Sequence, residues 1–252
     1  MNDDDKKQLN ILWLWPDILN LHGDRGNVMA LVHVCELYGI EAEVTRVNRL
    51  TDDIPIEAAD IIIMGAGELS VMPQIIKPLS NHTAELRRFA EDGGVLFATG
   101  TTGVVIGGET VRNTGNKFYG IELLDMECRE RAEPLGDDLI FMTNGLGNED
   151  TLPIYGIQIQ MMDVSLAPDQ QPFGEVIYGY GNNETLAEGA VYNNIIFSNA
   201  LGPVLVKNPW LTLDLINRTM ETPLIFDSGI FGLELMSAEA IRKFNKTKEK
   251  VK

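Results

Sequence analysis

Apolar residues in the first hundred positions fall into short runs separated by polar segments. Continuous runs at 10–15, 59–64 and 94–98 predict buried strands, because strands of a parallel sheet are covered on both faces. Residues 43–47 alternate between apolar and polar side chains, which predicts a strand at a sheet edge.

Helical spacing fills the segments between these runs. Apolar residues at 28–37 recur every three or four positions, which predicts a helix with Asn27 as its N-cap and an end at Gly39. A second helix is predicted at 81–92. Strands and helices therefore alternate, as is typical of a parallel sheet with right-handed crossovers.

The pattern changes after about residue 107. Strand candidates follow at 138–143, 154–161, 175–180 and 188–197, separated by turn residues. They either add antiparallel strands to the sheet or form a flanking layer. Helices are predicted at 207–220, with Asn208 as N-cap and Pro209 in the first turn, and at 238–244.

These elements predict an α/β fold with three layers, in which helices flank a mostly parallel sheet and extra antiparallel strands lie in the C-terminal half. No internal repeat or low-complexity linker divides the chain. We therefore expect a single domain over residues 1–252, with flexible ends at 1–9 and 246–252.

Composition and charge exclude several functional classes for this protein. The formal net charge of −17 disfavours binding to nucleic acid or to an anionic membrane through broad electrostatics. The sequence has no apolar run of membrane-spanning length and no secretory signal at its N-terminus, so a cytoplasmic location is expected. With only two cysteines and three histidines, and no metal-binding motif, we predict no disulfide, no metal site and no cofactor.

Three polar or glycine-containing loops follow predicted strands, at 16–27, 65–70 and 99–103. Sites in open α/β sheets lie at the carboxyl ends of strands, so these loops are expected to meet. Backbone N–H groups of the second and third loops could converge on one oxyanion. Thr99, at the tip of the third loop, would then occupy the position of a nucleophile.

Residues 15–27 read WPDILNLHGDRGN, which resembles the opening YPDLLNLYGDRGN of the GatD family. That family provides the glutamine amidotransferase subunit of lipid II isoglutaminyl synthase, among the CobB/CobQ-like class I amidotransferases. Further matches cover about residues 10–220, as IIIMGAG at 61–67, GIELLD at 120–125, GNN at 181–183, EGAVY at 188–192 and GPVLVKNP at 202–209.

The resemblance implies a class I, flavodoxin-like fold and the hydrolysis of glutamine. In the family, a cysteine at the strand–turn elbow attacks the side-chain amide, and a histidine before the GPLL motif transfers protons. Ammonia then passes to a Mur-ligase-like partner of the MurT type, which amidates the D-glutamate of lipid II. Glutamine or a related small molecule is the ligand that the resemblance implies.

The chain departs from the family pattern at the reactive positions. Thr99 stands in place of the cysteine and Leu201 in place of the histidine. The family's GGGQD loop is GAGEL at 65–69, and its GFENH motif is GIQIQ at 156–160, without a histidine. The last histidine in the chain is His82, so no histidine stands near residue 201.

Two hypotheses follow. The first is a catalytically silent GatD-like subunit that binds or regulates a Mur-ligase-like partner. The second is an active enzyme with rebuilt chemistry around Thr99, for which Thr101, Thr102, Glu68 and Arg131 are candidate groups. The predicted substrate-binding and oxyanion positions are Gly65, Gly67, Glu68, Gly100 and Arg131.

Overall fold

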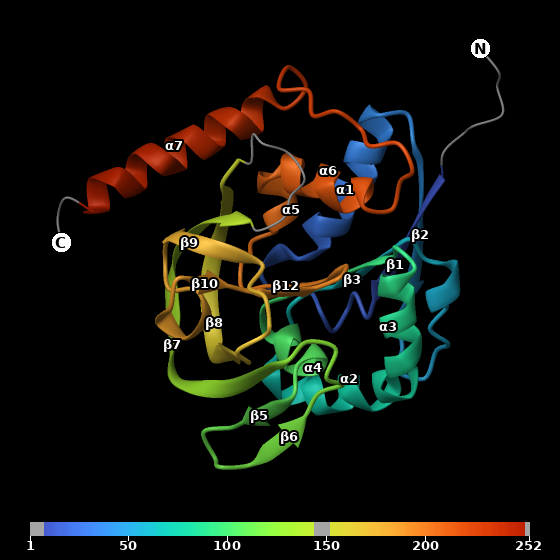
Figure 1. The fold of residues 1–252 in the computed structure, drawn as a ribbon, viewed down its shortest axis with the longest axis vertical. Helices are drawn as coiled ribbons and strands as arrows, with labels where there is room; N and C mark the ends of the chain where they lie inside the picture. The colour runs from blue at the N-terminus through green and yellow to red at the C-terminus, as the bar shows by residue number, and fades with distance from the viewer. Residues whose placement is uncertain (1–7, 144–151, 250–252) are drawn as a thin grey trace.

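The fold is built around a six-stranded sheet in a computed structural model, which describes residues 8–143 and 152–249 (Figure 1). Its strand order is β11-β12-β4-β3-β1-β2. The five strands from β12 to β2 run parallel, and only β11 is antiparallel to its neighbour. Their bounds are β1 Gln8–Leu14, β2 Glu41–Val47, β3 Ile61–Met64, β4 Val95–Thr99, β11 Ala190–Tyr192 and β12 Ile195–Ser198.

Helices cover both faces of this sheet, which confirms the predicted three layers. Ile61 and Ile63 of β3 belong to a core cluster shared with one group of helices, whereas Ile62 and Met64 belong to a cluster shared with the other. The first group is α1 (Arg25–Leu37), α5 (Val204–Lys207) and α6 (Pro209–Asn217); the second is α2 (Met72–Leu79), α3 (Thr83–Glu91) and α4 (Gly103–Ile106).

A second, mostly antiparallel sheet has the order β10-β9-β7-β5-β6, with β8 paired along β7. Its inner face contributes residues to both core clusters, so it packs beside the first sheet. The sequence left open whether the C-terminal strands extend the first sheet or form another layer, and the structure shows both. The bounds are β5 Glu109–Val111, β6 Lys117–Tyr119, β7 Met126–Thr143, β8 Ile154–Leu166, β9 Gly174–Tyr178 and β10 Ala187–Glu188.

Several predicted boundaries need correction. Asn27 lies inside α1 and is buried, so the prediction that it caps the helix is wrong: α1 begins at Arg25. Pro209 is the first residue of α6, and Asn208 precedes it, but the Asn208 side chain bonds to Tyr155 and Val204 instead of capping the helix. The predicted strand 188–197 is three short strands, because the chain turns at Gly189 and again at Asn193, whose φ angles are +58° and +50°.

The predicted C-terminal helix at 238–244 lies within the longer α7 (Gly232–Glu249), which extends outward from the molecule (Figure 1). Of the predicted flexible ends, residues 8 and 9 belong to β1 and residues 246–249 to α7. The rest of both ends lies outside the described residues. Within the described part of the chain, no helix has the length and apolar character needed to cross a membrane.

Short 3₁₀ turns connect several elements of the fold. Their bounds are η1 Leu21–Gly23, η2 Ile56–Ala58, η3 Leu69–Val71, η4 Ser80–His82, η5 Gly100–Thr102 and η6 Asn182–Glu184. Three of them, η1, η3 and η5, lie in the loops that the sequence analysis places at the carboxyl ends of the strands.

Candidate functional site

The three predicted loops meet at the carboxyl ends of β1, β3 and β4. Asp24, before α1, accepts a hydrogen bond from the backbone N–H of Ala66, just after β3. The same carboxylate oxygen accepts the hydroxyl of Thr99, the last residue of β4, over 3.3 Å. Because β3 pairs with both β1 and β4, the parallel sheet itself brings these three chain segments together.

Asp24 is a buried carboxyl group that sequence reasoning missed. It is 1% exposed, and burial raises its pKa from 3.8 to about 6, against the lowering effect of hydrogen bonds from Ala66, Thr99 and Asn27. Asn27 in turn accepts the backbone N–H of Leu205 over 2.9 Å. Asp24 and Asn27 therefore connect the 65–70 loop, the 99–103 loop and α5 to the start of α1. The sequence signal that could have identified these two residues is their place in the GDRGN motif.

The 65–69 loop packs too closely for larger residues. A Cβ on Gly65 would lie 2.7 Å from the carbonyl oxygen of Leu19 and 2.8 Å from the Cβ of Asp24. The N–H of Gly67 donates to the hydroxyl of Thr101 over 2.9 Å, and that hydroxyl lies 2.6 Å from the carbonyl oxygen of Gly67. The N–H groups of Ala66 and Gly67 thus already have acceptors within the protein.

Leu201 closes the turn that follows Thr99. Gly100 has a φ of +58°, and a Cβ there would lie 2.9 Å from Cδ2 of Leu201. Leu201 is 2% exposed and is held by two backbone hydrogen bonds with Ile157 of β8, of 2.8 and 3.1 Å. Thr99 is 1% exposed. The structure therefore places Leu201, the predicted base position, against Gly100, which directly follows Thr99, the predicted nucleophile position.

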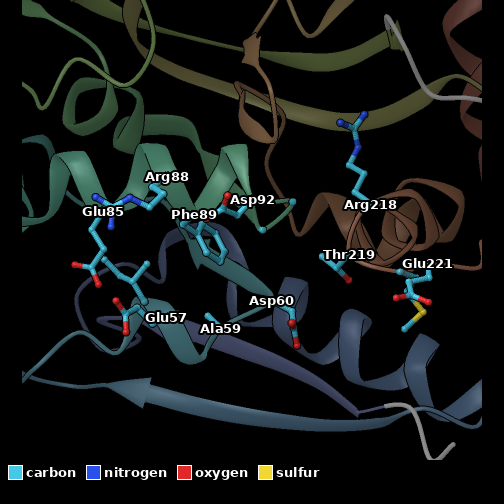
Figure 2. Close-up of a pocket in the computed structure, with 14 residues that line it drawn as sticks. Glu57, Ala59, Asp60, Glu85, Arg88, Phe89, Asp92, Arg218, Thr219 and Glu221 are labelled. Carbon is cyan, nitrogen blue, oxygen red and sulfur yellow. The ribbon is translucent and has the colours of Figure 1, made fainter.

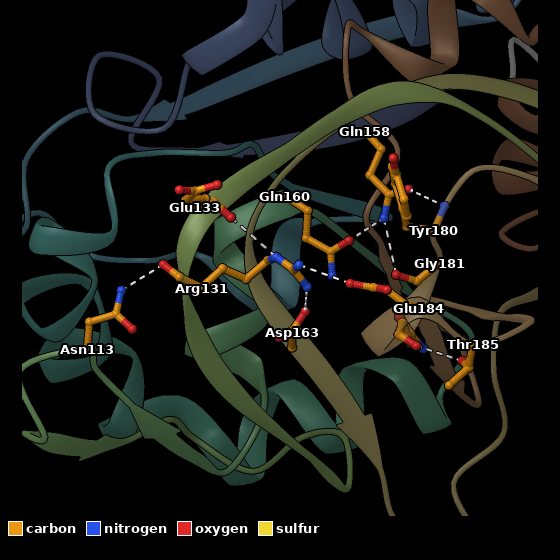
Figure 3. Close-up of polar contacts among 11 residues, drawn as sticks. Asn113, Arg131, Glu133, Gln158, Gln160, Asp163, Tyr180, Gly181, Glu184 and Thr185 are labelled. Atoms are coloured by element: carbon orange, nitrogen blue, oxygen red, sulfur yellow. Dashed lines mark hydrogen bonds and ion pairs between the residues drawn. The ribbon is translucent and has the colours of Figure 1, made fainter.

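The predicted charged groups lie in different surroundings. Glu68 is exposed, and its carboxylate accepts the hydroxyl of Ser70 over 3.3 Å. Arg131 lies in β7 of the second sheet, where its guanidinium pairs with Asp163 and, over 3.0 Å, with Glu184 (Figure 3). Its charge is thus already balanced by carboxylates of β8 and η6.

Two glutamines in the GIQIQ segment tie β8 to the loop around η6. Gln158 Nε2 donates to the side-chain oxygen of Gln160 and, over 3.1 Å, to the carbonyl oxygen of Gly181 (Figure 3). Gln158 Oε1 accepts the backbone N–H of Tyr180 over 3.0 Å. Both glutamines are buried, so this segment provides structural cross-links where the family motif ends in a histidine.

The GNN and EGA segments build a second buried polar centre around Glu188. Its carboxylate accepts the hydroxyl of Ser198 over 2.7 Å and both the backbone and side-chain N–H groups of Asn199 over 2.8 Å. Asn182 bonds to Asn199 and, through both of its side-chain atoms, to Gly189. Burial raises the pKa of Glu188, although these donors act in the opposite direction.

Three cavities of the structure lie away from this site. One of about 570 Å³ is bordered by Asp60 and Gly94, directly before β3 and β4, and thus opens at the amino ends of the strands (Figure 2). Two others, of about 600 and 610 Å³, border α1 with β2 and the β5–β6 region. None of the three is lined by Thr99 or Leu201.

Metal binding is not suggested by the geometry either. Among the residues placed by the structure, no three or more His, Cys, Asp or Glu side chains form a group that could hold a metal ion. Cys35 and Cys128 are buried free thiols, and burial raises the pKa of each to about 12.

Sequence comparison connects this arrangement to known proteins. The chain is 28% identical over 248 residues to lipid II isoglutaminyl synthase (glutamine-hydrolyzing) subunit GatD of Streptococcus pneumoniae, covering 96% of this chain and 93% of that protein. It is 27% identical over 217 residues to subunit GatD of Staphylococcus aureus, covering 85% of each. The chain is a homologue of GatD. No protein-family model matches it.

Solved structures of other proteins have a fold similar to that of this chain. A crystal structure of a glutamine amidotransferase has a TM-score of 0.50 at 18% identity and covers 82% of this chain and 98% of its own. The glutaminase domain of Trypanosoma brucei CTPS, with bound acivicin, has a TM-score of 0.52 at 8% identity and covers 87% and 96%. The fold is thus that of the class I glutamine amidotransferases.

The segments that resemble GatD divide into two kinds in this structure. Those around Asp24 and Glu188 are matched, and they supply buried hydrogen bonds that hold turns together. The resemblance predicts Thr99 and Leu201 at the positions of the family's cysteine and histidine, and both side chains are buried here. The matched segments supply the hydrogen-bonded scaffold around these two residues.

Proposed function

We propose that this chain is a GatD-like amidotransferase subunit that has kept its scaffold and lost glutamine hydrolysis. As a single class I amidotransferase-like domain in the cytoplasm, it would bind or regulate a Mur-ligase-like partner in lipid II amidation. The names of the two relatives support a subunit of that system. The observation that carries the loss of hydrolysis is the side chain of Leu201 packed against Gly100, beside the buried Thr99.

The chemistry supports this proposal. A hydroxyl is a weak nucleophile unless a base lies within hydrogen-bond reach, and leucine cannot accept a proton. Removal of a nucleophile or its base costs about 10⁴ to 10⁶ in rate where the two act as a unit. The N–H groups of Ala66 and Gly67 also have acceptors within the protein, which leaves neither directed at an oxyanion.

A second candidate function rests on the contact between Thr99 and Asp24. At neutral pH, Asp24, with a pKa of about 6, would be ionised and able to accept the proton of Thr99 over 3.3 Å. Thr99 would then be an activated nucleophile of an amidotransferase or hydrolase. The 1% exposure of both groups disfavours this function, because Leu201 would have to move before a substrate reached Thr99.

A glutaminase assay separates the two functions. We expect the purified chain to release no glutamate from glutamine, and Thr99→Ala to change nothing. Turnover that disappears in both Thr99→Ala and Asp24→Asn, and persists in the surface control Ser70→Ala, would establish the second function instead.

Co-expression tests the proposed partner. We expect the chain to co-purify with a Mur-ligase-like protein, which then amidates its substrate with free ammonia and not with glutamine. Failure to form that complex would contradict the proposed partner. Amidation with glutamine would contradict the proposed loss of hydrolysis. The roles of Gly65, Gly67, Glu68, Gly100 and Arg131 in binding a glutamine-like ligand stay a prediction.

A further inference from the structure

Helix α7 has one apolar side that packs on the rest of the protein. Ala238 is buried in a core cluster, and Leu235 and Ile241 are partly buried against the same cluster. These three residues are spaced three apart, so they lie along one side of the helix. Figure 1 shows that α7 extends outward beyond the sheets, which leaves its other side facing solvent.

The outer side of α7 carries a second apolar stripe. Leu233 is 79% exposed, Met236 is 71% exposed and Phe244 is 58% exposed, and Ala240 between them is also exposed. The spacings of three, four and four residues place all four on one side of the helix. A solvent-facing stripe of this kind is typical of a surface that another protein covers.

Charges beside the stripe indicate what covers it. Glu239 precedes Ala240 and pairs within the helix with Arg242, over 2.8 Å, and with Lys243, which follows Ala240, over 3.6 Å. If a second α7 crosses in the opposite direction at Ala240, Met236 lies against the other helix's Phe244. The same register places Glu239 beside the other helix's Lys243, and this pair occurs twice about the two-fold axis. The small side chain of Ala240 permits close approach at the crossing point.

We propose that a second copy of this chain covers the stripe, through antiparallel pairing of the two α7 helices about Ala240. The 18 residues of α7 span about 27 Å, which is long enough for such a pair. An anionic membrane surface fits less well, because Glu239 borders the stripe and the chain carries a net charge of −17. The proposal does not depend on the proposed function, since its readout is the mass of the particle.

Sedimentation of the full chain at about 0.15 M salt tests the pairing. We expect a concentration-dependent dimer with twice the 27.9 kDa mass of the chain, and a monomer for Met236→Glu. Leu186→Glu is the matched control, because Leu186 is 67% exposed and directly precedes β10 of the second sheet instead of lying on α7, and this variant should still dimerise. A wild-type chain that stays monomeric up to hundreds of micromolar would overturn the proposal.

Charge reversal tests the register. Glu239→Lys and Lys243→Glu should each weaken the dimer about tenfold, since each replaces two attractive contacts with repulsive ones. A mixture of the two variants should form a heterodimer more tightly than either forms a homodimer. The contact between residues 239 and 243 within each helix stays repulsive in the mixture, so recovery reports only the contact between chains.

Two results would contradict the pairing. In the first, the mixture of charge variants dimerises no better than each alone. In the second, the monomeric wild-type chain binds vesicles rich in anionic lipid and Met236→Glu does not, which would assign the stripe to a membrane surface. Circular dichroism of every variant should show unchanged helix content, which keeps unfolding separate from loss of pairing.

Discussion

Two buried carboxyl groups, Asp24 and Glu188, each hold chain segments of the candidate site together by hydrogen bonds. Asp24 has one backbone donor, and its contacts with Thr99 and Asn27 are both 3.3 Å long. Glu188 has three donors from Ser198 and Asn199 at 2.7–2.8 Å. Both belong to segments that resemble GatD, yet Glu188 is held far more completely than Asp24.

This difference separates two reasons for keeping a buried carboxyl group. The centre around Glu188 joins β10, β12 and η6, so its value is structural. Asp24 contacts Thr99, the predicted nucleophile position, so it borders the candidate site and also joins the three loops.

The largest loss of folding stability is expected when Glu188 is replaced. Glu188→Ala should lower the free energy of unfolding by about 4 kcal/mol, because the buried donors of Ser198 and Asn199 lose their acceptor. Urea denaturation measures the loss. Glu175→Ala, on the exposed side of β9, should change stability by less than about 0.5 kcal/mol, and equal losses in the two variants would contradict the proposed structural role.

Leu201→Ala should cost about 3 kcal/mol in the free energy of unfolding, because it leaves a cavity over the turn at Gly100. Gly100→Ala should also destabilise, since the added methyl group meets Leu201 and the backbone has a φ of +58°. Combining the two should cost less than their sum, because the shortened side chain removes the clash. Strictly additive losses would show that Leu201 does not close the turn.

Asp24 should make stability depend on pH. Its folded pKa of about 6 lies above the ordinary value of 3.8, so the group favours folding while it is protonated. That contribution is complete below about pH 3.8 and is lost as the pH rises through 6. Relative to Asp24→Asn, the free energy of unfolding of the wild-type chain should therefore fall by up to about 3 kcal/mol between pH 4 and pH 7.5.

Thermal or urea unfolding of both proteins across this pH range measures the difference. Glu188 and Asp214, whose pKa values burial also raises, are present in both proteins, so their contributions cancel. Asp17→Asn, at an exposed carboxyl group, is the control and should follow the wild-type profile. Parallel profiles for wild type and Asp24→Asn would contradict the pKa shift at Asp24.

The smallest effect is expected at Thr99. Thr99→Val should lower the free energy of unfolding by about 1 kcal/mol, because it keeps the shape of the side chain and removes one long hydrogen bond to Asp24. At pH 4, where Asp24 is protonated, the loss should be smaller than at pH 7.5. A loss as large as that of Leu201→Ala would show that Thr99 holds the three loops together more strongly than its 3.3 Å contact indicates.

The parallel sheet could be predicted because β3 and β4 are buried on both faces and therefore read as unbroken apolar runs. Only the end of the long strand β7 could be predicted from the sequence. Much of its earlier part carries charged side chains that face solvent, so this part has no apolar pattern. Helix α2 was missed because Pro73 and Pro78 suggest a loop, although the first lies in the opening turn and the second near the end.

The site was only partly predictable, for a physical reason. Family motifs placed Thr99 and Leu201 at paired positions, and the structure brings Leu201 against the adjacent Gly100. Asp24 lies in a polar, glycine-containing loop that is typical of exposed surface. The 65–69 loop packs against it and contributes to its burial, so the GDRGN motif marks the residue in the sequence but not its burial.

The position of β12 has a consequence for how the chain is made. β4 ends at Thr99, but its neighbour β12 begins only at Ile195, after the whole second sheet. Until β12 has been synthesised, the backbone groups along one edge of β4 have no hydrogen-bonding neighbour. That edge can then associate with other chains. Fragments that stop before Ile195 should therefore aggregate, and chaperone dependence should end only when the last quarter of the chain emerges.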